Sequence, residues 1–259
     1  MQAELLREIK GLLLDLDGTL YTNAGPIVGA PQAIRHIDEA GISYRYVTNA
    51  THIPRRDIAA RLRELGFPAE KNRIITPAIA IAERLGEDAV CHVLVNDSLL
   101  EDLEGVTVTG DFPDYVAVGN LGEGFTYARL NTAFRHLMDG AELISLLENR
   151  YWQDADGNLN LDAGPFVAAL EYASGKEAYC VGKPEVALFA NAVGDLGLSS
   201  GEVAMVGDNL YVDVAGAQAA GLTGILVESG SAKPESSSVR PDLILKSVAE
   251  LPEALGLGM

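Results

Sequence analysis

Cysteine is scarce in this chain of 259 residues, which has only Cys91 and Cys180. The two lie far apart and have no partner at a metal-binding spacing, so disulfide-built classes are excluded and two reduced thiols in a reducing compartment are expected. Long apolar runs are also missing. No stretch reaches the length of a membrane span, and charged residues interrupt the first ten positions, unlike a signal peptide. We therefore expect a soluble, cytoplasmic protein.

Basic residues are few, with 19 Lys and Arg against 37 Asp and Glu and a formal net charge of -18. Phosphate backbones and anionic bilayers repel such a surface, which disfavours nucleic acid and membranes as partners. The acidic excess is spread along the chain, and only six of the bases are Lys. Adaptation to high salt is one hypothesis, because salt screens self-repulsion; an ordinarily acidic cytosolic enzyme is the other.

Apolar runs of strand length alternate with segments of helical spacing along most of the chain. This rhythm predicts an α/β fold with a parallel, Rossmann-like core sheet. The rhythm changes between residues 77 and 176, so we expect an inserted module there and a core domain made of residues 1–76 and 177–259. The core strands are expected at residues 11–14, 42–48, 73–76, 178–181, 203–206, 224–227 and 243–245. The core helices are expected at residues 31–40, 54–65, 184–196, 212–220 and 248–255.

The inserted module mixes two expected helices, at residues 77–85 and 126–138, with short strands at 89–95, 106–109 and 115–118. Residues 154–158 lie between two short apolar segments and predict a hairpin turn built on Asp156 and Gly157. A calcium loop is improbable there, because Leu159 stands where such a loop needs glycine. In the core, the Ser-rich residues 229–240 predict a mobile loop.

The first predicted strand ends abruptly in Asp15 and Asp17, which are followed by Gly18. Open α/β sheets build their ligand sites at the carboxyl ends of their strands, and glycine lets the backbone turn tightly there. We therefore expect the chemistry at Asp15 and Asp17. The alternative is a surface turn that uses Asp and Gly only as turn formers.

Two other strands are followed by groups that suit an anion. Thr48 and Asn49 end the second strand and offer a hydroxyl and turn amides, although turn chemistry alone would explain them. Lys183 precedes Pro184 at an expected helix start, where its ammonium can neutralise an anion; an exposed surface lysine is the alternative.

The strand at residues 203–206 is followed by Asp208, Asn209 and Asp213. The two carboxylates supply the hard oxygen ligands that Mg²⁺ requires, although either could be a helix N-cap. Each of these strand ends suits one task in phosphoryl transfer, so their sum is more specific than any one part.

Four motifs stand in a familiar order: DLDGT at residues 15–19, TN at 48–49, GKP at 182–184, and GDN at 207–209 followed by Asp213. In this order they resemble the haloacid dehalogenase superfamily of phosphatases over nearly the whole chain. The position of the insertion resembles the NagD-type branch, in which a large α/β cap domain, here residues 77–176, is inserted into the core. Within that branch, RYW at 150–152 and GPF at 164–166 look most like the phospholysine phosphohistidine inorganic pyrophosphate phosphatases.

The resemblance implies a Mg²⁺-dependent phosphatase. Asp15 would attack phosphorus and form an aspartyl-phosphate, and Asp17 would protonate the leaving oxygen and then deprotonate water. The metal ligands would be Asp15, Asp208 and the backbone carbonyl of Asp17. Asn209 would support these ligands, and Asp213 would be an outer ligand or a partner of the motif lysine.

The same resemblance assigns phosphate binding to Gly18, Thr48, Asn49 and Lys183. Asp17 argues against a dehalogenase, which does not need this acid. Transporting ATPases of the superfamily are also excluded, because they carry Lys at the position of Leu16 and have membrane spans.

In the cap, Arg150 and Tyr151, with Trp152, are the hypothesised substrate contacts, and packing at a strand end is their alternative role. Residues 147–150 depart from the Thr-Asn-x-Asp stretch of NagD-like enzymes, which makes nucleotide or small-sugar substrates doubtful. The expected substrate is a small phosphomonoester, phosphoramidate or pyrophosphate. A phosphotransferase and a noncatalytic phosphate-binding protein are the alternatives, and the family suggests a homodimer through the cap.

Overall fold

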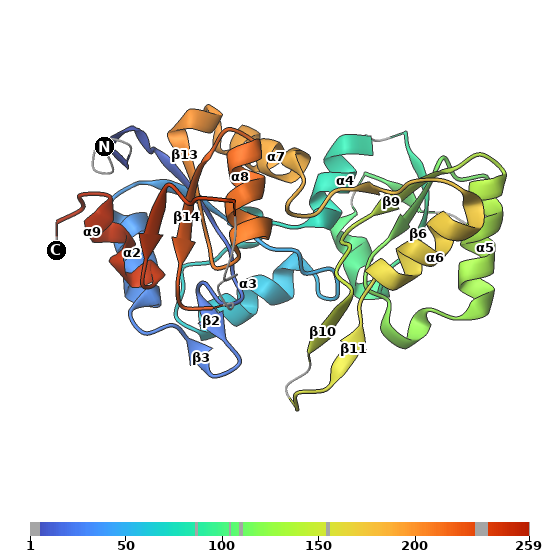
Figure 1. Cartoon of the computed structure of the whole chain (residues 1–259), viewed down its shortest axis with the longest axis horizontal. Coiled ribbons are helices and arrows are strands. Elements are labelled where there is room, and N and C mark those ends of the chain that lie inside the picture. The colour runs from blue at the N-terminus through green and yellow to red at the C-terminus, as the bar shows by residue number, and fades with distance from the viewer. Residues whose placement is uncertain are drawn as a thin grey trace. The chain divides into compact units, whose positions relative to one another are not determined.

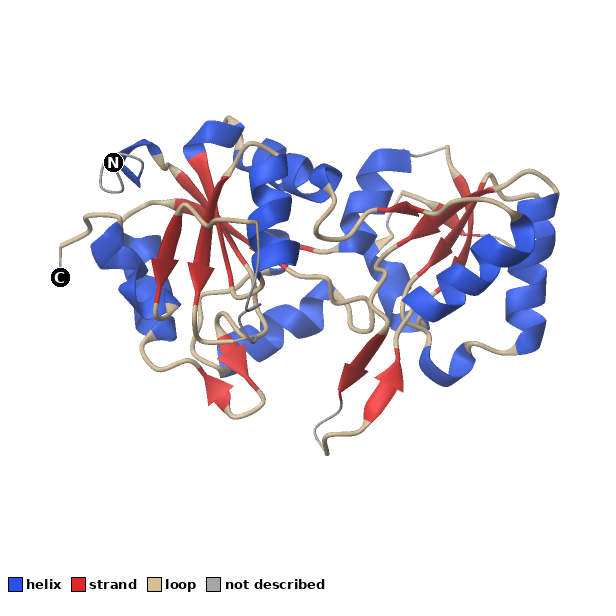
Figure 2. Cartoon of the chain, in the orientation of Figure 1, coloured by secondary structure: helices blue, strands red, loops and turns tan. Residues whose placement is uncertain are grey.

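The computed structural model describes residues 6–85, 88–103, 105–108, 111–153, 156–230 and 238–258. The chain forms two compact units. The first comprises Met1–Thr48, Arg55–Ile75 and Lys183–Met259, and the second comprises Asn49–Pro54 and Thr76–Gly182. Figure 1 labels the elements of each unit, and Figure 2 shows that each is a sheet accompanied by helices.

The first unit is built on a six-stranded sheet in the order β15-β14-β13-β1-β4-β5, in which all neighbours are parallel. Its three leucines in β1 are completely buried, because a central parallel strand is covered on both faces. This explains why the first strand reads as an unbroken apolar run. The strands are β1 (Gly11–Leu14), β4 (Ser43–Val47), β5 (Ile74–Ile75), β13 (Val203–Gly207), β14 (Thr223–Val227) and β15 (Leu243–Leu245).

The helices of this unit lie on both faces of the sheet. The chain runs from β1 through α2 to β4 in one direction along the sheet and from β13 through α8 to β14 in the other, so right-handed crossovers place α2 and α8 on opposite faces. The helices are α2 (Ala30–Glu39), α3 (Arg55–Glu64), α7 (Val186–Leu196), α8 (Gly216–Ala219) and α9 (Leu251–Ala254). A small antiparallel hairpin, β2 (Tyr21–Thr22) and β3 (Gly25–Pro26), follows β1.

The second unit has its own five-stranded parallel sheet, in the order β12-β9-β8-β6-β7. Buried side chains of β6, β8 and β9 form one apolar cluster with α5 and α6, so this unit has a core of its own. Its helices are α4 (Pro77–Leu85), α5 (Tyr127–Met138) and α6 (Gly164–Ser174). Its strands are β6 (Val90–Leu94), β7 (Thr107–Val108), β8 (Tyr115–Val118), β9 (Glu142–Ser145), β10 (Tyr151–Gln153), β11 (Leu159–Leu161) and β12 (Tyr179–Cys180).

One predicted strand belongs to the other sheet. Residues 178–181 were expected to be a core strand, but β12 pairs in parallel with β9 of the second unit. The expectation was wrong because apolar patterning shows that a segment is a strand and does not show which strand it will pair with. The predicted hairpin is confirmed: β10 and β11 pair in antiparallel register on either side of the turn, of which residues 154 and 155 lie outside the described part.

Two other predictions changed in detail. The expected helix at residues 212–220 begins earlier, as a π-helical turn, η6 (Leu210–Ala215), that continues into α8. The Asn209 side chain accepts hydrogen bonds from the amides of Tyr211 and Val212 and so caps this turn. The C-terminal helix is a 3₁₀ turn, Val248–Glu250, followed by α9. Of the predicted mobile loop, residues 231–237 lie outside the described part, and Ser229 and Gly230 are placed.

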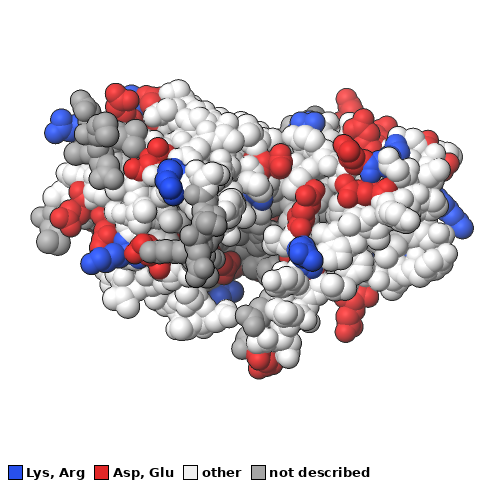
Figure 3. All heavy atoms as spheres, viewed as in Figure 1, with Lys and Arg blue, Asp and Glu red and all other residues white. Residues whose placement is uncertain are grey.

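Figure 3 shows acidic side chains spread over the visible face of both units, with basic ones among them. None of the helices formed by the described residues combines the length and the apolar character needed to cross a bilayer.

Candidate active site

The predicted site residues of the first unit gather at the carboxyl ends of three adjacent strands. Asp15 follows β1, Asp208 follows β13 and Thr48 follows β4, and these strands are neighbours in the order β13-β1-β4. The chain leaves β1 toward β4 on one side and reaches β13 on the other. This is the kind of reversal at which open α/β sheets place their ligands.

Lys183 binds directly to two of the aspartates. Its buried ammonium group donates hydrogen bonds to Asp15 Oδ1 at 2.5 Å, Asp213 Oδ1 at 2.7 Å and the Val47 carbonyl oxygen at 3.3 Å. An ammonium group has three N–H donors, which matches these three acceptors in number. The side chain is therefore held between strand ends that are distant in the sequence.

Burial and charge act in opposite directions on this cluster. Burial by itself lowers the pKa of Lys183, but the carboxylates of Asp15 and Asp213 outweigh it and raise that pKa above its ordinary value. Burial raises the pKa of Asp213, because the charged carboxylate has lost water, and Lys183 offsets only part of this effect. The ammonium group thus stays charged while it stabilises buried carboxylates.

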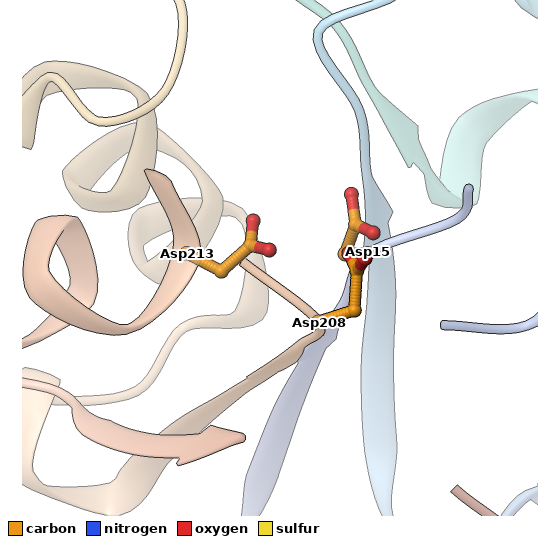
Figure 4. A group of neighbouring side chains, drawn as sticks. All are labelled: Asp15, Asp208 and Asp213. Carbon is orange, nitrogen blue, oxygen red and sulfur yellow. The ribbon is translucent and has the colours of Figure 1, made fainter. Parts of the chain in front are cut away.

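Asp15, Asp208 and Asp213 together form a candidate metal site. Each offers one carboxylate oxygen, and these atoms lie within 4.8 Å of one another (Figure 4). Carboxylate oxygens are the ligands that Mg²⁺ prefers, so the donor set fits a hard divalent cation. Asp213 was expected to be a partner of Lys183 or an outer ligand; the structure places it both in contact with Lys183 and within this group.

Asp17 lies apart from the three carboxylates. Its side chain is exposed, and the Tyr21 hydroxyl lies 3.5 Å from its Oδ2 atom, at the limit of a hydrogen bond. Gly18 follows with φ of 82°, and a Cβ atom there would lie only 2.4 Å from Asp208 Oδ2. Glycine at position 18 therefore meets both a backbone requirement and a steric one.

Thr19 is part of the DLDGT motif but was given no role from the sequence, and in the structure it contacts the candidate nucleophile. Its completely buried hydroxyl donates to Asp15 Oδ2 at 3.0 Å, while Asp15 Oδ1 is bound by Lys183. Both oxygens of Asp15 are thus held. A buried threonine four residues after a strand-end aspartate is a weak signal, because a turn or core role would look the same in the sequence.

The remaining predicted residues divide between the units. Thr48 is buried in the first unit, and its amide donates to the Ile75 carbonyl at 3.1 Å. Asn49 belongs to the second unit, where its side chain lies beside Gly182. Arg150 and Tyr151 also belong to the second unit, at the start of the β10–β11 hairpin, and both are exposed.

A parallel α/β core interrupted by a second α/β unit, with aspartates at the ends of central strands and a buried lysine bound to them, is the arrangement of the haloacid dehalogenase-like (HAD-like) hydrolases. The chain belongs to this family: a haloacid dehalogenase-like hydrolase model matches residues 12–109 and a HAD-hydrolase-like model matches residues 180–251. It is a phosphatase of the NagD type, with a core and a cap.

Its relatives include a phospholysine phosphohistidine inorganic pyrophosphate phosphatase of Danio rerio, 35% identical, with 97% of this chain and 96% of the relative covered. The human haloacid dehalogenase-like hydrolase domain-containing protein 2 is 41% identical, with 86% of each chain covered.

Among solved structures, 4-nitrophenylphosphatase of Thermotoga maritima superposes with a TM-score of 0.89 at 27% identity, covering 97% of this chain and 99% of that one. NagD of E. coli superposes with a TM-score of 0.86 at 28% identity, covering 93% of this chain and 98% of that one. The family and the fold class predicted from the sequence are thereby confirmed.

Proposed function

We propose that this chain is a Mg²⁺-dependent phosphatase that hydrolyses a small phosphorylated compound through an aspartyl-phosphate on Asp15. The observation that carries the proposal is the position of Asp15. It lies in the carboxylate group with Asp208 and Asp213, and the ammonium group of Lys183 holds one of its oxygens at 2.5 Å. A buried carboxylate beside a fixed cation and a candidate metal site has the environment of an anionic nucleophile that must approach a phosphate.

The reaction has two steps. An oxygen of Asp15 attacks phosphorus as the bond to the leaving group breaks, and Asp17 gives its proton to the leaving oxygen. Asp17 then takes a proton from water, which attacks the phosphorus of the aspartyl-phosphate, releases phosphate and regenerates Asp15. The exposure of Asp17 supports this role, because a proton shuttle must reach both the leaving group and solvent.

Asp15 and Asp208, with the backbone carbonyl of Asp17, would hold the Mg²⁺ ion, and Asn209 and Asp213 would support them. Bound there, the ion would neutralise phosphoryl oxygens and orient the substrate. The Asn209 side chain caps η6 and so stabilises this turn. The backbone N–H of Asn209 donates to Asp213 Oδ2 at 3.1 Å. This backbone contact ties the segment that carries Asp208 to the segment that carries Asp213.

In this proposal, the residues that bind the phosphate are Gly18, Thr48, Asn49 and Lys183. Lys183 contributes positive charge, Thr48 a hydroxyl, and the other two backbone or amide donors. Of these four, Lys183 has the most direct structural support, because its ammonium group contacts the nucleophile.

The inserted module would be the cap that selects the substrate; it was predicted as residues 77–176 between core segments 1–76 and 177–259, and in the structure its unit extends through β12 to Gly182. Arg150 and Tyr151 are its candidate contacts, and both are exposed on the second unit. The substrate class is a phosphomonoester, phosphoramidate or pyrophosphate, which agrees with the names of the relatives. We also propose a homodimer through the cap and a cytoplasmic location; the scarcity of cysteine, with only Cys91 and Cys180 in the chain, supports the latter.

The test is release of inorganic phosphate from a panel of phosphoesters, phosphoramidates and pyrophosphate with Mg²⁺. Asp15→Asn should lower the rate by at least about 10³-fold, as expected for loss of a nucleophile. Asp57→Asn, an exposed carboxylate on α3, is the matched control and should retain full activity. Equal phosphate release by Asp15→Asn and the parent would refute the proposal.

A second assay separates hydrolysis from transfer. Adding an acceptor alcohol and quantifying its phosphorylated product distinguishes a phosphotransferase from a phosphatase. If most of the phosphoryl group appears on the acceptor at low alcohol concentration, the enzyme is a transferase. If no compound in the panel releases phosphate yet the protein binds phosphate, the noncatalytic alternative holds.

A further inference from the structure

The turn that follows β14 reaches the candidate metal site. Because β14 is the parallel neighbour of β13, its carboxyl end lies beside the end that carries Asp208. Ser229, just beyond β14, donates from its hydroxyl to the Gly18 carbonyl at 2.8 Å, although the two residues are 211 positions apart. This contact ties the turn to the backbone that follows the candidate nucleophile.

The next residue, Gly230, lies directly against Asp208. A Cβ atom at position 230 would lie 2.1 Å from Asp208 Oδ2, 2.6 Å from its Cγ and 2.8 Å from its Cβ. The backbone of Gly18 approaches the same Oδ2 atom, with a hypothetical Cβ at 2.4 Å. Two glycine backbones from distant parts of the chain therefore both closely approach the carboxylate of Asp208.

The need for glycine at position 230 comes from this contact and not from the backbone. Gly18 has a positive φ, which L side chains rarely adopt, whereas Gly230 is not among the residues with positive φ. An alanine at position 230 would therefore not have to adopt a positive φ, but its methyl group would occupy the space of the Asp208 side chain.

We infer that Ser229 and Gly230 are positioning residues that hold the Asp208 carboxylate in the orientation required for Mg²⁺. The inference rests on the proposed function, because it takes Asp208 to be a metal ligand. Gly230 limits the side-chain positions open to Asp208, and Ser229 keeps the Gly18 backbone in place beside it. Groups that orient a metal ligand typically change metal affinity by about 10- to 100-fold when they are altered.

The test measures Mg²⁺ binding by isothermal titration calorimetry on the full chain, without substrate. Gly230→Ala should weaken Mg²⁺ binding by about 10-fold or more, because the added methyl group displaces the Asp208 carboxylate. Ser229→Ala should weaken it by a smaller factor, because the backbone approach of Gly230 remains. Gly194→Ala is the matched control: Gly194 is exposed in α7 with no atom near the added methyl group, so Mg²⁺ affinity should not change.

Melting temperatures in EDTA separate positioning from folding. The inference requires Gly230→Ala and Ser229→Ala to lose Mg²⁺ affinity in samples that still melt cooperatively without metal. If Gly230→Ala does not fold, Ser229→Ala alone decides, and unchanged affinity in that variant would overturn the inference. Unchanged affinity in a folded Gly230→Ala protein would overturn it as well.

Asp208→Asn keeps this test distinct from that of the proposed function. If the parent binds no Mg²⁺, or if Asp208→Asn binds it as tightly as the parent, the metal site itself is wrong. If Asp208→Asn loses binding while both turn variants retain it, the proposed function survives and only the positioning role fails.

Discussion

Replacing Lys183 with methionine should destabilise the core unit in a pH-dependent way. Methionine keeps much of the length of the side chain but removes the ammonium group that contacts Asp15 at 2.5 Å and Asp213 at 2.7 Å. Both carboxylates are buried, so the variant removes the positive charge that compensates them in the metal-free protein and leaves neutral donors, the Thr19 hydroxyl and the Asn209 amide. Removing one member of a buried ion pair typically costs about 3–5 kcal/mol, and we expect about 3 kcal/mol at pH 8 in EDTA.

Lowering the pH should recover much of the lost stability, because protonation of a buried carboxylate removes the negative charge that the ammonium group compensated. Burial already raises the pKa of Asp213 to about 7 with Lys183 present, and removing the lysine raises it further. Below that pKa the folded variant binds a proton that the unfolded chain does not bind, so the free energy of unfolding rises as the pH falls. For one proton the gain is at most about 2.7 kcal/mol between pH 8 and pH 6.

The assay must report on the core. Trp152, the single tryptophan, lies in the cap, so its fluorescence follows the other unit. Hydrogen exchange of peptides that contain β1 and β13, measured across a urea series at pH 8 and pH 6, gives the stability of the relevant sheet. Lys10→Met is the matched control: Lys10 pairs with Glu202 on the surface, and its loss should change stability by less than about 1 kcal/mol.

The outcome is decided by comparing the two pH values. If Lys183→Met is less stable than the parent by the same amount at pH 8 and pH 6, the substitution acts through packing, and the explanation by uncompensated carboxylate charge is refuted. No loss at pH 8 would mean that the ammonium group does not compensate these charges.

Three further predictions concern other features. Thr19→Val removes the hydroxyl that donates to Asp15, so it should lower the free energy of unfolding by about 1–2 kcal/mol in a melting assay and should also lower kcat. Thr19→Ser keeps the hydroxyl and should retain both stability and kcat, and full activity of the valine variant would contradict this prediction. Burial raises the pKa of the Cys91 thiol to about 12, so Ellman's reagent at pH 8 should modify Cys180 quickly and Cys91 only after unfolding. Rapid modification of both thiols in the native protein would contradict this prediction. If the acidic surface reflects adaptation to salt, the urea midpoint should rise between low and molar potassium chloride, and an unchanged midpoint would reject that hypothesis.

Local patterns predicted the main strands of the core and most of the candidate site. A fully buried strand must be apolar throughout, so its end is visible where Asp15 follows Leu14. Because the carboxyl ends of neighbouring parallel strands meet, polar residues at several strand ends predicted a common site, and Asp208 lies there with Asp15. Lys183 also contacts Asp15, although the strand that precedes it, β12, pairs in the other sheet.

The sequence by itself determined the strand ends, the family and the identity of the charged groups, because these depend on patterns within a few neighbouring residues. Only the tertiary structure decided that β12 pairs with β9 and that Thr19 holds Asp15. The same is true of the Ser229–Gly230 turn, which lies against Gly18 and Asp208 although it follows a different strand. Strand pairing and close backbone approach are set by which distant segments pack together, and no local period or propensity records that choice.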